Sequence, residues 1–340
     1  MKQDLLSGLG AAAWGARLSK AAVVPNFPMP RVYGIADNLR DCCDVFDVES
    51  QSSAITAAMA AVACEKRSFL ALDGIQSLQD FCNAAFMRLP LVAAGTTLAL
   101  RDNGWLMFIP ESNQEILDTV IQAYRICEDS SVLLPGFVYL DFPELREPVF
   151  IPKEQSIKGF LPNLRLQNKI DAKKPMAIGI PDGLELKAQQ QKAMNNALKI
   201  IPKVNEIWKK RFKRSYGLVE GYCLEDADNA IVVAGSDALT AKVAVNHLRE
   251  QGEKVGLLRL RVIRPLPTEI IRDALKNIKR LAVVDKAISI GSSGILYKDI
   301  KEGYDGFCSN FIAGRLSEKD FVDIFKQIKI AEKPERFWFL

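Results

Sequence analysis

Residues 44–72 read DVFDVESQSSAITAAMAAVACEKRSFLAL, and this stretch decides the fold. Its first part, Asp44 to Glu49, alternates apolar and polar residues as the end of a strand does. Ser50 then suits the N-cap region of an alanine-rich helix. The stretch closes with Ser68 to Leu72, a short apolar run typical of a buried strand. Strand, helix and strand in this order predict a parallel sheet flanked by helices.

The same alternation continues to Leu140. Helices are expected at Ser77 to Phe86 and at Asn113 to Glu128, and buried strands are expected at 89–94, 105–109 and 131–140. Upstream, residues 4–20 are rich in small residues and are interpreted as a helix. Residues 21–30 are expected to form a loop, because three closely spaced prolines forbid a helix there.

A second α/β unit follows a long connector. Residues 141–183 have little periodicity, and residues 184–212 are amphipathic and predict one long helix that Pro202 either kinks or divides. From Ala230 onward, strands and helices alternate again, with a last strand expected at 311–314 and a helix at 318–328. The predicted domains are therefore residues 1–140, a connector at 141–228 and residues 229–340.

Composition excludes several classes of function. The 340 residues carry a formal net charge of only +4, without a block of like charges, which argues against a nucleic-acid or membrane-surface role. No apolar run approaches the ~18 residues of a membrane span. Seven scattered cysteines without a CxxC pair indicate reduced thiols in a cytoplasmic protein and no metal site on this chain. His247, the single histidine, lies within a predicted helix and is an improbable general base.

Seven segments carry a resemblance to a known family. In order along the chain they are VESQSSA (48–54), LPLV (89–92), RDNGW (101–105), ESNQEILDTVIQAYRI (111–126), GLVEGY (217–222), GEKVGLLRLRVIRPLP (252–267) and VVDKAISIGSSGILY (283–297). Together they resemble the α subunit of the thiamine-diphosphate-dependent pyruvate:ferredoxin oxidoreductases. The similarity extends from the first helix to residues 311–325, and it is more specific for the family than for the substrate.

The resemblance implies a fold and a division of labour. Residues 1–140 would be the pyrimidine-binding domain for thiamine diphosphate, and residues 229–340 a transketolase-C-terminal-like α/β domain. A β subunit would hold the diphosphate, Mg²⁺ and an iron–sulfur cluster. The 4Fe–4S clusters would lie on partner subunits, with none on this chain, and ferredoxin-like and γ-type subunits would be further partners. The complex would convert a 2-oxoacid and CoA to an acyl-CoA and pass electrons to ferredoxin.

By the same resemblance, Glu49 is the catalytic and cofactor-binding residue. Thiamine chemistry needs a carboxylate hydrogen-bonded to the aminopyrimidine ring, and VES occupies the corresponding place. The alternative is that Glu49 merely interacts favourably with a helix N-terminus. A second short motif, Gly291 to Gly294, follows a strand and suits either a plain turn or a cradle of backbone N–H groups for an anion.

The chain departs from the family on the substrate side. Phe27 stands where the family has a threonine that contacts the substrate carboxylate, and Leu98 stands where it has an arginine. The loop that follows is shortened, so that Arg101 is the nearest cation. The altered substrate end would comprise Phe27, Thr96, Thr97, Leu98 and Arg101. These changes favour either an acid other than pyruvate or a non-catalytic α-like subunit that scaffolds or regulates such a complex.

Overall fold

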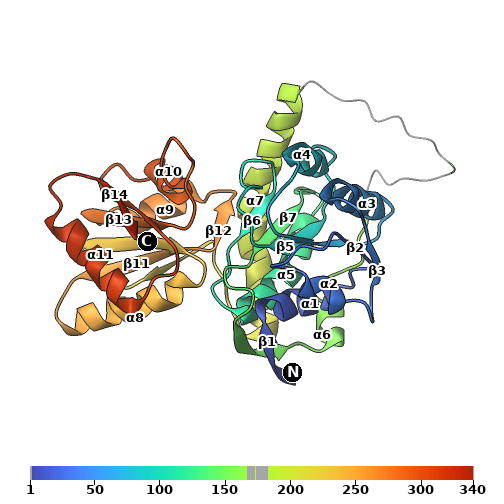
Figure 1. Ribbon diagram of the computed structural model, residues 1–340, viewed down its shortest axis with the longest axis horizontal. Helices are drawn as coiled ribbons and strands as arrows, with labels where there is room; N and C mark the ends of the chain where they lie inside the picture. Colours follow the sequence, from blue (N-terminus) through green and yellow to red (C-terminus); the bar gives the residue numbers. More distant parts are fainter. Residues whose placement is uncertain (1, 167–172, 174–182, 340) are drawn as a thin grey trace. The chain divides into compact units, whose positions relative to one another are not determined.

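A computed structural model describes residues 2–166, 173 and 183–339 of the chain. The contacts between residues divide it into two units, Met1–Ser215 and Tyr216–Leu340, each with a sheet and helices packed against it (Figure 1). Residues 167–172 and 174–182 of the expected connector lie outside the described residues.

Parallel strands form the centre of the first unit. β2 pairs with β3, and β6, β7, β5 and β4 are neighbours in that order, all parallel. A single parallel bridge between Val23 and Ser68 links β2 to the start of β4. β1 and β8 form a two-stranded antiparallel sheet of their own. The strands are β1 (Lys2–Ser7), β2 (Val23–Asn26), β3 (Asp44–Asp47), β4 (Phe69–Leu72), β5 (Val92–Gly95), β6 (Leu106–Phe108), β7 (Gly136–Tyr139) and β8 (Arg146–Ile151).

Three helices of this unit are capped by a serine side chain. The hydroxyls of Ser7, Ser50 and Ser112 each accept a backbone N–H bond from the first helical turn, which satisfies a donor that the helix itself leaves open. The first residue of each of these helices is therefore determined by residues close to it in the sequence. The helices of the unit are α1 (Gly8–Leu18), α2 (Gly34–Asp37), α3 (Gln51–Ala63), α4 (Leu78–Phe86), α5 (Asn113–Cys127), α6 (Glu154–Lys158) and α7 (Gly183–Phe212).

Helix α5 is the buried centre of this helical packing. It contacts α1, α7 and β7. The close approach of α1 depends on Gly15, since a Cβ there would lie 2.6 Å from Cβ of Val120 on α5. The long helix α7 remains one continuous helix (Figure 1), and Pro202 within it is exposed.

Three predictions about the first unit were wrong in detail. Residues 4–7 belong to β1 and not to a helix, because they pair with β8. Residues 23–26 form β2 and not a loop. Pro25 is tolerated there because β2 is paired on its β4 side only through the isolated bridge at Val23, so that little pairing on this side needs the N–H that proline lacks. The region after residue 140 contains β8 and α6, whose partners are distant in sequence.

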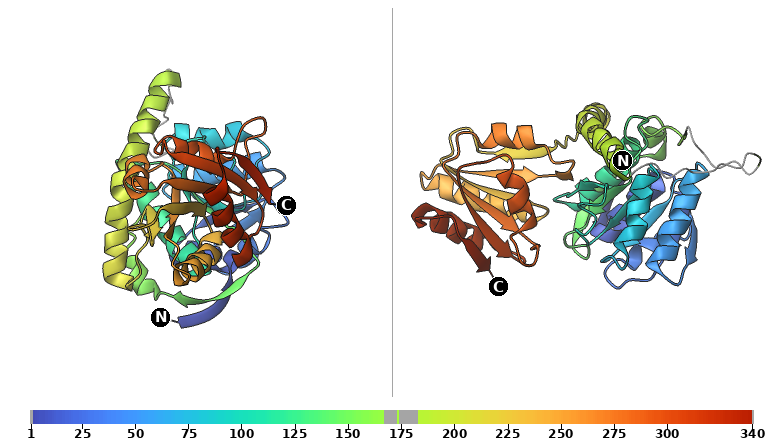
Figure 2. Two further views of the ribbon diagram at one scale, coloured as in Figure 1. Left: turned by 90° about the vertical axis from the view of Figure 1, so that its left-hand side faces the viewer. Right: turned by 90° about the horizontal axis from the view of Figure 1, so that it is seen from above.

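The second unit is a six-stranded sheet in the order β15-β14-β13-β10-β11-β9, parallel except for β9. Helices α8 and α11 pack together on one face, and α9 and α10 lie on the other (Figures 1 and 2). The elements are β9 (Val219–Tyr222), β10 (Asn229–Ala234), α8 (Asp237–Glu250), β11 (Val255–Leu260), β12 (Val262–Arg264), α9 (Thr268–Leu275), β13 (Arg280–Asp285), α10 (Ile295–Lys301), β14 (Phe307–Ala313), α11 (Glu318–Ile330) and β15 (Arg336–Phe339).

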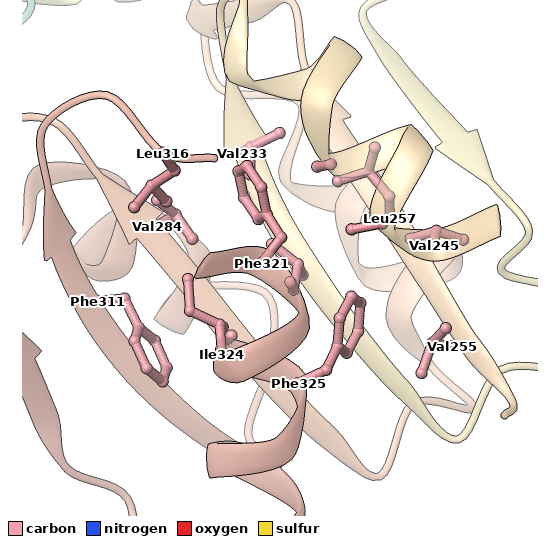
Figure 3. Close-up of a cluster of buried hydrophobic side chains, with 14 of the residues drawn as sticks. Val233, Val245, Val255, Leu257, Val284, Phe311, Leu316, Phe321, Ile324 and Phe325 are labelled. Atoms are coloured by element: carbon pink, nitrogen blue, oxygen red, sulfur yellow. The ribbon is translucent and has the colours of Figure 1, made fainter. Parts of the chain in front are cut away.

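A hydrophobic core joins α8 and α11 to the sheet. Phe321 and Phe325 of α11 lie against Val233 and Leu257 of the central strands (Figure 3). The prediction of a last strand at 311–314 was wrong, because β15 follows it at the sheet edge. This short strand forms because Phe337 stacks on Phe311, with ring centroids 4.8 Å apart.

Candidate functional site

The carboxyl ends of the parallel strands bring the expected site residues to one edge of the first unit. Asn26 of β2 is in register with Asp47 of β3, and Leu72 of β4 with Gly95 of β5. The residues that follow these ends therefore leave the sheet on the same side. They are Phe27, Glu49, Asp73 and Thr96. Loops at this edge are where open parallel sheets bind ligands.

Glu49 lies between the end of β3 and the N-cap of α3, and its side chain is exposed. The Ser53 hydroxyl, one turn into α3, donates a hydrogen bond to the Glu49 carboxylate. This bond holds the pKa of Glu49 below its ordinary value, and the N-terminal end of the helix dipole favours the same ionised form. The carboxylate is thus kept ionised, oriented and open to a ligand.

Thr96 is anchored to the end of the neighbouring strand. Its hydroxyl donates to the Asp73 carboxylate, and its N–H donates to the carbonyl of Leu72 at 3.0 Å. Gly95 permits this approach, since a Cβ on Gly95 would lie 1.7 Å from the Leu72 oxygen. The Thr96 hydroxyl is therefore already bonded to a carboxylate of this chain, that of Asp73.

The other substrate-side residues lie in one turn-rich segment after β5. Thr97 is buried, and its hydroxyl accepts the N–H of Ala99 at 3.2 Å. Leu98 is half-buried, and its carbonyl accepts the N–H of Arg101 at 3.2 Å. The Arg101 guanidinium pairs with the adjacent Asp102 at 3.0 Å. Its positive charge is therefore partly compensated locally.

Phe27 lies half-buried directly after β2. Its neighbour Asn26 donates from its side-chain amide to the Asp47 carboxylate of β3 at 2.7 Å. This bond ties the loop that contains Phe27 to the strand that leads to Glu49.

Gln51 joins the start of α3 to two loops at this edge, and reasoning from the sequence missed it. It is 1% exposed at the first position of α3. Its amide nitrogen donates to the Met29 sulfur at 2.9 Å and to the carbonyl of Gly74 at 3.2 Å. Its oxygen accepts the N–H of Gln76 at 2.8 Å. Because its partners are distant in sequence, no local pattern marks Gln51 as more than a helix residue.

Two other features lie in the second unit. His247 lies in α8, as its predicted helical position requires, and it is exposed and bonded to Glu318 at 2.8 Å. The Gly291–Gly294 motif belongs to a loop closed by the N–H of Ser289 on the carbonyl of Ser293. This loop borders an open cavity of about 690 Å³, which Arg336 and Trp338 also line.

Two negative findings concern the described part of the chain. No group of three or more histidine, cysteine or acidic side chains is arranged there to hold a metal ion. Its helices also include none that is both long and apolar enough to cross a membrane.

Two family descriptions match the chain. Residues 91–210 match "Pyruvate flavodoxin/ferredoxin oxidoreductase, thiamine diP-bdg", and residues 227–320 match "Pyruvate:ferredoxin oxidoreductase core domain II". The pyruvate synthase subunit PorA of Methanothermobacter thermautotrophicus is 34% identical over 99% of this chain and 97% of its own length.

Solved structures support the same fold. The chain resembles a 2-oxoglutarate:ferredoxin oxidoreductase from Magnetococcus marinus with a TM-score of 0.75 at 14% identity, over 96% of this chain. It spans only 65% of that longer chain. A split-gene transketolase in its inactive β4 tetramer gives a TM-score of 0.56 at 12% identity, over 95% of this chain and 98% of its own.

The predicted fold class is confirmed: a parallel α/β domain of the thiamine-diphosphate-binding type is followed by a transketolase-C-terminal-like α/β domain. The family resemblance stated for the sequence is confirmed as well, because the similarity to PorA covers nearly the whole length of both chains. The chain belongs to the pyruvate:ferredoxin oxidoreductase family, in the place of the α subunit that pyruvate synthase subunit PorA represents.

Proposed function

We propose that this chain is the α subunit of an enzyme that oxidatively decarboxylates a 2-oxoacid to an acyl-CoA and passes the electrons to ferredoxin. The observation that carries the proposal is the ionised, exposed carboxylate of Glu49 at the edge where the strand ends meet. The pyruvate synthase relatives support an oxoacid of the pyruvate type.

The residues of this edge fit the pyrimidine half of thiamine diphosphate. An exposed carboxylate can accept a hydrogen bond from the aminopyrimidine ring, and Ser53 holds Glu49 ready for that contact. When bound, the cofactor would supply the nucleophilic carbon and the electron sink for decarboxylation. The role of this chain would be to hold the Glu49 carboxylate in a fixed position, where it can share a proton with the aminopyrimidine ring. Gln51 holds the surrounding loops in place through its hydrogen bonds. Residues 1–140 would form the domain that binds the pyrimidine.

The remaining parts of the site would come from partner subunits. We expect a β subunit to hold the diphosphate, Mg²⁺ and an iron–sulfur cluster, and ferredoxin-like and γ-type subunits to carry electrons onward. The seven free thiols suit assembly of this complex in the cytoplasm.

The substrate side would be lined by Phe27, Thr96, Thr97, Leu98 and Arg101. Thr96 and Arg101 each pair with a carboxylate of their own chain, Asp73 and Asp102. The carboxylate of any 2-oxoacid, pyruvate included, would therefore have to compete with Asp73 and Asp102 for these donors, which would weaken its binding. The same pairing favours the second candidate function, a non-catalytic α-like subunit.

The test is turnover of the assembled complex. The chain is co-expressed with its β, γ and ferredoxin-like subunits. Reduction of a viologen dye is then followed with thiamine diphosphate, Mg²⁺, CoA and a panel of 2-oxoacids. The Glu49→Gln variant should lower kcat by about 10²–10⁴-fold, the usual contribution of a group that assists proton transfer. The matched control is Asp44→Asn, an exposed carboxylate at the other end of the same strand, which should keep full activity.

The outcomes separate the two functions. Turnover with one acid that depends on Glu49 supports the enzyme and names its substrate. Assembly and cofactor binding without turnover on any acid would instead support the scaffolding subunit. Equal activity of Glu49→Gln and Asp44→Asn would contradict the role of Glu49.

A further inference from the structure

Cys42 and Cys43 form a dithiol on the surface of the first unit. Their sulfur atoms lie 3.6 Å apart, although the two residues are neighbours in sequence. In an extended strand, successive side chains point to opposite faces. Here the chain turns before β3, and the N–H groups of both cysteines donate to the carbonyl of Leu39, at 3.1 and 2.9 Å. The turn therefore brings both thiols to the same side.

Local hydrogen bonds hold the pair in this arrangement. The Cys43 thiol donates to the carbonyl of Ala21 at 3.1 Å, and the Cys42 thiol donates to the carbonyl of Leu39 at 3.5 Å. Cys42 is exposed and Cys43 is half-buried. A reagent from solvent can thus reach Cys42 first and find the second sulfur already in place.

The distance between the sulfurs selects the kind of atom that can bridge them. With bonds of about 2.3 Å to each sulfur, a linear bridge would need the sulfurs ~4.6 Å apart. The observed 3.6 Å corresponds instead to a bent bridge with an angle of ~100°. A zinc ion needs four ligands, and the described residues hold no group of three histidine, cysteine or acidic side chains that would supply them.

A monosubstituted trivalent arsenical meets these requirements. Its arsenic atom forms a bent centre, prefers sulfur ligands and has two hydroxyl groups that thiols can replace. We propose that Cys42 and Cys43 form a binding site for such arsenicals. Two As–S bonds form and two As–O bonds of the hydrated arsenical break. The two thiol protons leave with these oxygens as two water molecules, and arsenic stays trivalent, so no oxidant is required.

Condensation suits this pair better than thiol–disulfide exchange. Burial and the neighbouring Cys42 raise the pKa of Cys43 to about 12. Cys43 is therefore a thiol at neutral pH, and it is a poor nucleophile for the second step of disulfide exchange, which needs a thiolate at this position. Condensation with an arsenic hydroxide uses the thiol itself and releases water, so no thiolate is needed.

The test uses the purified full chain and phenylarsine oxide, with binding measured by native mass spectrometry. We expect one phenylarsenic group per chain, with a mass gain of that group less two hydrogens. Dithiothreitol should remove it, and glutathione at the same thiol concentration should not. Cys42→Ser and Cys43→Ser should each weaken binding by ~10²-fold or more, because the second bond then loses its high effective concentration. Cys64→Ser is the control, since Cys64 is exposed and single.

A second measurement tests whether binding depends on the folded structure or only on the presence of two adjacent cysteines. If the fold prepares the dithiol, the arsenical binds the folded state more tightly and raises the melting temperature of the wild type but not of Cys43→Ser. An unchanged or lower melting temperature of the arsenical-bound wild type would contradict the proposal. So would full binding by Cys43→Ser, or loss of binding in Cys64→Ser.

Discussion

Gln51 shows how one buried amide can organise the candidate site. A Gln51→Leu substitution keeps a similar volume but leaves the carbonyl of Gly74 and the N–H of Gln76 without this partner. Unmet polar groups of this kind cost about 1–3 kcal/mol each. We expect Gln51→Leu to lower the free energy of unfolding by ~2–4 kcal/mol in urea titrations. Gln79→Leu, an exposed glutamine in α4, should change it by less than ~0.5 kcal/mol, and equal effects would contradict the bridging role.

Asp285 introduces a dependence of stability on pH. Its carboxylate accepts the N–H groups of Leu296 and Tyr297 and the Asn310 amide, which lower its pKa, but burial outweighs them and raises the pKa to about 6. An unfolded aspartate has a pKa near 3.9. Between these values the folded state binds more protons than the unfolded state. The contribution of Asp285 to stability is therefore greatest at low pH and is lost as pH rises towards 6, by roughly 2–3 kcal/mol.

The matched variant for this effect is Asp285→Asn. It should be less stable than the wild type at low pH, because the amide nitrogen that replaces one carboxylate oxygen cannot accept an N–H bond. The advantage of the wild type over Asp285→Asn should shrink between pH 4 and pH 6.5 in urea unfolding. Parallel curves for the two proteins over this interval would contradict the raised pKa.

At the scale of elements, Asp118 joins α5 to the end of α7. Asp118 is fully buried and accepts the Trp208 indole N–H at 3.2 Å and a guanidinium N–H of Arg214 at 2.9 Å. Removing one partner of a buried ion pair costs about 3–5 kcal/mol. Asp118→Ala should therefore destabilise the first unit by roughly that amount in thermal or urea unfolding. Asp37→Ala, which breaks an exposed pair with Arg40, should cost less than ~1 kcal/mol.

Strand ends, more than single residues, create the candidate site. Each loop leaves the sheet at the same edge because β2, β3, β4 and β5 run parallel. A reversal of any one of these strands would move its loop to the opposite edge. The antiparallel pair β1–β8 contributes no loop to this edge, which is consistent with its separate pairing.

For the whole molecule, we propose that partner chains complete the active site, a proposal supported by the relatives, which are named as subunits. The described residues contain no group of three ligands for a metal ion, and the seven cysteines contain no CxxC pair for a cluster. We expect the purified chain alone to show no viologen reduction with any 2-oxoacid in the presence of thiamine diphosphate, Mg²⁺ and CoA. Activity should appear when the partner subunits are added. Turnover by the chain alone would overturn the proposed division of labour.

The sequence by itself determined the features that depend on near neighbours. The serine cap of α3 and the amphipathic α7 follow from residues a few positions apart, and both form within a few residues of the predicted positions. Family resemblance added Glu49, whose position at a strand end is the one that the structure shows. Its role remains a prediction that the Glu49→Gln measurement tests.

Only the tertiary structure decided the features that depend on distant partners. β8 forms because β1 pairs with it from the other end of the unit, and β15 forms because its phenylalanines bury against Phe311. The partners of Gln51 come from loops that meet only when the strands align. Likewise, the sequence shows two adjacent cysteines, but only the turn before β3 brings both sulfurs to one side. Such contacts arise from strand pairing and burial, which local periodicity does not encode.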